Sequence, residues 1–203
     1  MSKIFTYIPQ QAFELVRLRV FGILGEELAN QLNALGNYLA DADVYLERFI
    51  PFALTDLPAV NVTLATGEYQ GQTAITSPGT YRYFIDFYHS AVTTGLEQEQ
   101  SYDRLAMLNV TRLLGIGRAI IEDARYNTLG FAPPFISRRW IEKIGIAEPN
   151  DRDAAGMVKG RIILAVTVNE SVPLASAIAW AENFTQLNLA DTDAGYMYIQ
   201  TQP

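Results

Sequence analysis

The chain has 203 residues, a length that fits one folded domain. Hydrophobic residues make up 49% of it and charged residues 18%, which excludes a disordered chain. With no cysteine and a single histidine, His89, it has no disulfide framework, no thiol nucleophile and no histidine-rich metal cage. The net charge of −7 excludes a strongly basic nucleic-acid-binding surface.

The basic residues are strongly biased in type. Twelve of the 15 are arginine and three are lysine. Because the planar guanidinium matches a carboxylate, arginine is well suited to ion pairs at protein contacts. This bias favours an interaction protein. We find no secretory signal and no apolar stretch long enough to span a membrane, so we expect no membrane partner.

The N-terminal third predicts helix followed by strand. Apolar residues recur at helical spacing over residues 9–24, and a second apolar stripe follows over residues 26–39. Gly22 and Gly25 fall near the junction, so the pattern allows either two helices or one kinked helix. Residues 44–50 predict a short strand that stops at Pro51.

Two further strands are expected over residues 59–65 and 81–88, where apolar residues alternate. The polar residues 67–79 between them predict a long hairpin loop. Tyr83, Ile85 and Phe87 share one face of the second strand, whereas Phe84 and Tyr88 lie on the other. We therefore expect protein to cover both faces.

The remainder of the chain predicts a helix over residues 101–126, an irregular region over 128–158 and a strand over 161–168. Leu105, Leu108 and Leu113 repeat at helical spacing in that helix. A short helix at 173–181 and strands at 184–189 and 196–201 complete the prediction. The fold class is α+β: an antiparallel or mixed β-sheet with helices packed on one face. Residues 1–203 form one domain, with a core of about 9–126 plus 160–170, an insertion at 128–158 and a C-terminal extension at 173–203.

Candidate catalytic groups are few. His89 follows the strongest strand, and Asp86 is the nearest acid, but no nucleophile motif accompanies them. The run 115–117, Gly-Ile-Gly, lies inside a helical pattern, which favours close helix packing over phosphate binding. The Asp-x-Asp pairs at 151–153 and 191–193 are more typical of turns than of a cation site. We expect no enzyme, cofactor or metal.

One segment carries more information. Val44-Tyr45-Leu46-Glu47-Arg48-Phe49-Ile50-Pro51 is followed by Leu57-Pro58-Ala59-Val60-Asn61-Val62, then by Tyr81-Arg82-Tyr83-Phe84-Ile85-Asp86, a long helix and a late strand. This order resembles the lambda-type tail-terminator (minor tail protein U-like) family of long-tailed bacteriophages. The resemblance covers residues 9–126 and the strand near Arg161.

The resemblance implies a structural protein of the virion neck, assembled in the host cytoplasm. Its homohexameric ring would cap the tail tube, end tube polymerisation and form the head-joining surface. The partners would be copies of itself, the tail tube protein and the head-to-tail connector or neck proteins. Genomic DNA would pass through the acidic lumen without specific binding. A head-to-tail connector or head-completion protein is an alternative of the same class, and a small hydrolase is an alternative of another.

The residues that we expect at interaction surfaces come from four regions. A polar loop at 67–79 can order on docking to the tube, and the strands of residues 184–201 can add to a neighbour's sheet edge. Arginine beside tryptophan is typical of interface anchors. The expected interaction residues are Glu47, Arg48, Tyr69, Gln70, Arg138, Arg139, Trp140, Tyr196 and Tyr198.

Overall fold

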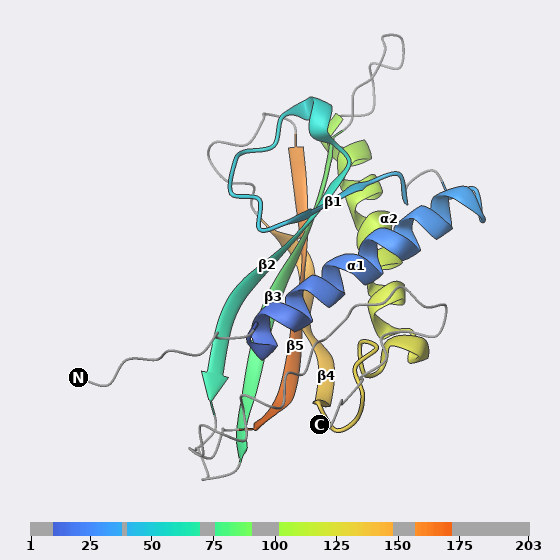
Figure 1. Ribbon diagram of the computed structural model, residues 1–203. Coiled ribbons are helices and arrows are strands. Elements are labelled where there is room, and N and C mark those ends of the chain that lie inside the picture. The colour runs from blue at the N-terminus through green and yellow to red at the C-terminus, as the bar shows by residue number, and fades with distance from the viewer. Residues whose placement is uncertain (1–9, 38–39, 70–75, 91–101, 148–156, 172–203) are drawn as a thin grey trace.

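The computed structural model describes residues 10–37, 40–69, 76–90, 102–147 and 157–171. Within them, five strands form one mixed sheet in the order β1-β2-β3-β5-β4, and two long helices pack against it (Figure 1). The predicted α+β class with a mixed sheet is therefore confirmed. The elements in chain order are α1 (Ala12–Asn33), β1 (Asp43–Leu46), η2 (Leu54–Asp56), β2 (Ala59–Tyr69), β3 (Thr76–Ser90), α2 (Tyr102–Glu122), η3 (Ala124–Tyr126), β4 (Ile136–Ala147) and β5 (Met157–Ser171).

The long central strands set the architecture. β3 pairs antiparallel with β2 on one side and with β5 on the other, and β4 pairs antiparallel with β5. The short β1 lies parallel to β2, with Val44 opposite Val60. β1 and β4 are therefore the outermost strands, at opposite ends of the sheet.

Both long helices cover the same face of the sheet. The alternation in β3 places Tyr83, Ile85 and Phe87 on this face, where all are fully buried. The Tyr83 hydroxyl donates to the Phe13 carbonyl of α1 at 3.0 Å, and the apolar stripes of α1 and α2 complete one continuous core. We call the opposite face, which carries Arg82, Asp86 and Arg161, the polar face. In the described part of the chain no long helix covers it.

Of the two alternatives left open for residues 9–39, the structure shows one helix: α1 runs through Gly22 and Gly25, because an open position in an amphipathic helix tolerates glycine at modest cost. Other predicted boundaries were wrong. β1 covers only part of residues 44–50. β2 continues to Tyr69 and β3 begins at Thr76, so most of the predicted loop at 67–79 is strand.

The region predicted to be irregular contains a 12-residue strand, β4. Register shifts between Ile136 and Arg138 and between Ile141 and Lys143 interrupt its alternation, which hides the strand from a period-two pattern. In α2, Leu105 and Leu108 are 39% and 55% exposed, so the predicted core stripe does not extend to the start of that helix.

Candidate interaction surfaces

The segment from Val44 to Val62 folds around Arg48. The Arg48 amide donates to Asn61 Oδ1 at 3.0 Å, and Asn61 Nδ2 donates back to the Arg48 carbonyl at 2.9 Å. Asn61 lies in β2 with only 4% of its surface exposed. These reciprocal bonds tie the chain after β1 to the sheet.

The Arg48 guanidinium also holds together the loop formed by residues 47–56, which we call loop 47–56. Its Nη2 donates to Asp56 Oδ2 at 2.5 Å and to the Pro51 carbonyl at 3.3 Å. Its Cζ lies 4.3 Å from the centre of the Phe52 ring, within cation–π range. The Ala53 amide, together with Arg48, holds the pKa of Asp56 below its usual value. Arg48 therefore shapes the loop from within.

The loop presents two apolar side chains to solvent. Phe52 turns inward and joins a small second core with Ala59, Tyr88 and Met157 on the polar face. Phe49 and Ile50 turn outward and are 83% and 74% exposed, the largest values among the large hydrophobic residues that the structure describes. A fixed pair of exposed apolar side chains is typical of a contact surface.

Glu47 is placed between this loop and α1. Its φ of 51° is unusual for a residue other than glycine, and its carboxylate pairs with Arg17 of α1. The prediction singled out Glu47 and Arg48 as interaction residues. In the structure both form intramolecular contacts that hold the loop in place, and their neighbours Phe49 and Ile50 are the exposed pair.

The structure separates the residues of the Arg138-Arg139-Trp140 run. The Arg138 Cζ lies 4.6 Å above the Trp140 ring centre. Arg139 faces the helices, where its Nη1 donates to the Ile121 carbonyl at the end of α2 and its Nη2 donates to Asn127 Oδ1 at 3.4 Å. Burial lowers the pKa of Arg139. Arg139 therefore caps a helix, whereas Arg138 and Trp140 lie on the polar face of β4.

The outer strand β4 also carries exposed apolar residues. Ile144 lies opposite Ile162 and Ile146 opposite Gly160, so both face the helix side, yet they are 40% and 47% exposed. A cavity of about 340 Å³ lies between β4 and the end of α2, lined by Ile121, Glu122, Arg139, Trp140, Ile141 and Leu164. The β4 side of the sheet therefore combines exposed isoleucines with a hollow whose lining includes the polar side chains of Glu122 and Arg139.

The polar face carries ion pairs that join different strands of the sheet. Asp86 of β3 is 5% exposed and accepts two hydrogen bonds from Arg161 of β5, at 2.5 and 2.7 Å. The Arg161 Cζ lies 3.9 Å above the Phe84 ring centre. Arg82 pairs with Glu142 of β4, where a single Nε–H is shared between the two carboxylate oxygens at 3.0 and 2.8 Å. Both arginines therefore form ion pairs within the chain.

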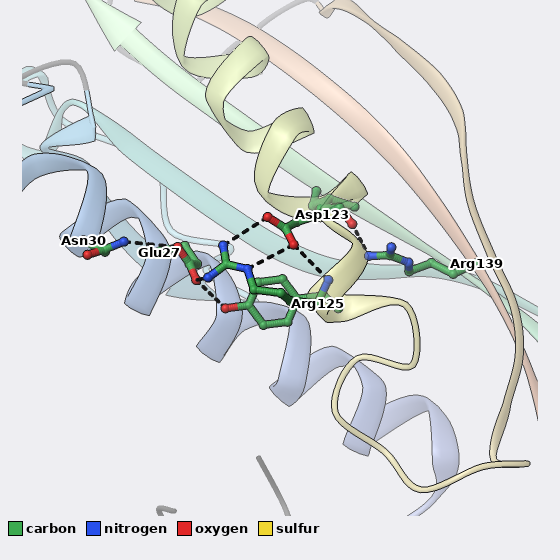
Figure 2. Close-up of polar contacts among 7 residues, drawn as sticks. Glu27, Asn30, Asp123, Arg125 and Arg139 are labelled. Carbon is green, nitrogen blue, oxygen red and sulfur yellow. Dashed lines mark hydrogen bonds and ion pairs between the residues drawn. The ribbon is translucent and has the colours of Figure 1, made fainter. Parts of the chain in front are cut away.

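A second polar cluster joins α1 to the turn after α2 (Figure 2). Glu27 of α1, which is 8% exposed, accepts a hydrogen bond from the Tyr126 hydroxyl and lies 3.4 Å from Arg125 Nη1. Arg125 also pairs with Asp123 at the end of α2. Burial, and then the bond to Glu27, raises the pKa of Tyr126 to about 12. The cluster anchors α1 to the turn after α2.

Among the other predicted interaction residues, Tyr69 is at the end of β2. It is 56% exposed, and its hydroxyl accepts from Tyr81 at 3.1 Å. Gln70, Tyr196 and Tyr198 lie outside the described residues, as do the predicted elements at 173–181, 184–189 and 196–201 and both Asp-x-Asp pairs.

The candidate catalytic residues do not converge. His89 and Asp86 are three positions apart in β3, so their side chains leave opposite faces of the sheet, and Asp86 is held by Arg161. Gly117 packs closely against Phe87, as the interpretation of the glycine pair predicted, whereas Gly115 has open space at its Cβ position. Within the described residues, no group of three or more histidine or acidic side chains could hold a metal ion, and neither long helix has the apolar run needed to cross a bilayer.

Comparison with known proteins yields no match, either to a protein-family model or to a curated protein sequence. The function must therefore be inferred from the structure of the chain itself. The relevant features are the exposed apolar residues, the Arg48 contacts and the ion pairs of the polar face. Sequence reasoning missed Asp56 and Asn61, whose side chains hydrogen-bond to Arg48. The only sequence signals for these two contacts were an acidic residue eight positions after Arg48 and an asparagine in the following strand.

Proposed function

We propose that this chain is a structural subunit of a phage neck, a tail terminator whose ring caps the tail tube and ends its polymerisation. The observation that carries the proposal lies in the segment that resembles the tail-terminator family. That segment folds around Arg48 and projects Phe49 and Ile50 into solvent. Such a segment is suited to protein contacts, which is what a capping subunit requires.

The physical basis of capping is asymmetric contact. A tube of stacked rings grows because each ring offers the next a surface that differs from the one it binds with. A terminator matches the growing end on one side and presents a different surface on the other. Growth then stops without a chemical step, and the second surface is free to bind the head-to-tail connector.

The test is tube assembly in vitro. Tail tube protein is polymerised with and without a molar excess of the chain, and tube lengths are measured by negative-stain electron microscopy. We expect shorter tubes with a ring at one end, and a hexamer by native mass spectrometry. Unchanged tube lengths would contradict capping. A dodecamer that binds the head portal would favour the connector alternative.

The same proposal implies that genomic DNA passes through the ring without being bound. A ring of subunits that each carry a net charge of −7 repels phosphates, so DNA moves through it without being held. Fluorescence anisotropy with a labelled duplex should show no binding at moderate salt. Tight binding that weakens steeply as salt is added would contradict this part of the proposal.

A further inference from the structure

Exposed apolar residues lie on two opposite sides of the sheet. Loop 47–56 follows β1 and exposes Phe49 and Ile50, whereas β4 exposes Ile144 and Ile146. β1 and β4 are the outermost strands in the sheet order. One molecule can therefore offer a different apolar surface to a neighbour on each side.

The charges on these two sides are opposite. Asp41 and Asp43 are exposed on the β1 side, where Glu47 is already paired with Arg17. Arg138 and Lys143 are exposed on β4.

Considering only contacts within the described part of the chain, none of Asp41, Asp43, Arg138 and Lys143 takes part in an ion pair. The β1 side is therefore acidic and the β4 side basic, in a chain whose net charge is −7.

We propose that the β1 side of one copy docks on the β4 side of the next, head to tail. Phe49 and Ile50 then pack against Ile144, Ile146 and the adjoining cavity, and the exposed acids face the exposed bases. The inference rests on the proposed function, since it names the contact that builds the ring.

Charge pattern favours this arrangement over a two-fold dimer. A two-fold axis brings identical surfaces together, which would oppose acid to acid on the β1 side or base to base on β4. Head-to-tail docking instead pairs opposite charges at every contact, and it leaves each copy with a free surface for the next. Because Arg48 and Asp56 hold the loop in position, little conformational freedom is lost on docking.

The absence of cysteine makes a direct crosslinking test possible. Two variants, Phe49→Cys and Ile146→Cys, are mixed in the full-length chain and oxidised. We expect a mixed disulfide dimer, and a ladder of crosslinked oligomers from the chain that carries both changes. Ala119→Cys, on an exposed position of α2, is the matched control and should crosslink with neither.

The other outcomes overturn the inference in distinguishable ways. Self-crosslinking of Phe49→Cys alone would indicate a two-fold contact. An internal disulfide between Ile146→Cys and Tyr198→Cys would show that the chain's own C-terminal residues occupy the β4 surface. A ring seen by native mass spectrometry without crosslinks would reject these surfaces and leave the proposed function standing. No assembly with or without tube protein would reject both.

A charge exchange gives a second test. Asp43→Lys and Lys143→Asp should each weaken self-association by about tenfold, because each places like charges across the contact. The chain that carries both changes should recover most of the loss. Sedimentation velocity measures the association constants. Equal losses in the single variants with no recovery in the double variant would contradict pairing between the two sides.

Discussion

Gly117 of α2 lies directly over the ring of Phe87 in β3. A Cβ on Gly117 would approach Phe87 Cζ to 2.3 Å, closer than two carbon atoms can approach without displacement. The helix therefore reaches the sheet at a point where no side chain separates them. Gly115, two residues earlier in the same helix, has open space at its Cβ position.

These two glycines predict opposite effects on stability. Gly117→Ala should lower the free energy of unfolding by about 1–3 kcal/mol, because the overpacked ring or helix must shift. Gly115→Ala should raise it by up to about 1 kcal/mol through helix propensity. Urea denaturation followed by circular dichroism measures both. Equal effects of the same sign would show that the close approach has no energetic consequence.

The Arg48–Asp56 pair predicts a pH dependence. Because the pKa of Asp56 is lowered in the folded state, its ionised form contributes stability above the unfolded pKa of about 3.8, and this contribution is lost as the pH falls through the lower folded value. The difference in unfolding free energy between the native chain and Asp56→Asn should be largest near neutral pH and shrink below pH ~4. Glu26→Gln, at an exposed position of α1, is the control and should show no comparable change. A difference that is constant with pH would contradict the assignment.

The buried pair on the polar face predicts an asymmetry between single and double changes. Asp86→Ala leaves the Arg161 guanidinium without its carboxylate and should cost about 2–4 kcal/mol. Arg161→Met combined with Asp86→Leu removes both charges and should recover much of that loss, because the desolvation penalty is removed as well. Chemical denaturation of the three variants tests this. Additive losses would mean that the pair does not act as a unit.

The contact between Glu27 and Tyr126 predicts an alkaline effect. Burial and this hydrogen bond raise the pKa of Tyr126 to about 12, so stability that is present below the unfolded pKa of about 10 is lost as the pH rises through 12. Tyr126→Phe should cost about 1 kcal/mol at pH 7 and should reduce the alkaline loss between pH ~10 and ~12. Thermal unfolding across this pH range is the measurement. If Tyr126→Phe loses as much stability between pH ~10 and ~12 as the native chain, another group causes the alkaline loss.

The sequence predicted well the elements whose side chains alternate or repeat against one core. The strand at 81–88 was found because Tyr83, Ile85 and Phe87 face the helices. The helix at 101–126 was found because Leu113 and Ile120 repeat on its buried side. β4 was missed because its two register shifts break the alternation.

For the candidate surfaces, the sequence identified the segment but not its geometry. Glu47 and Arg48 were singled out, whereas Phe49 and Ile50 are the exposed residues. Whether an arginine points inward or outward depends on partners such as Asp56 and Asn61, which no local pattern reveals.

The sequence by itself determined the α+β class, the helical and strand character of the strongly periodic segments and the lack of thiol chemistry. Only the tertiary structure decided that the apolar pair of loop 47–56 and the isoleucines of β4 lie on opposite sides of one sheet, with acids beside the first and bases beside the second. Periodicity arises from neighbours within a few residues, so the sequence displays it directly. The ends of a sheet are set by which strands pair, and pairing joins residues far apart in the chain.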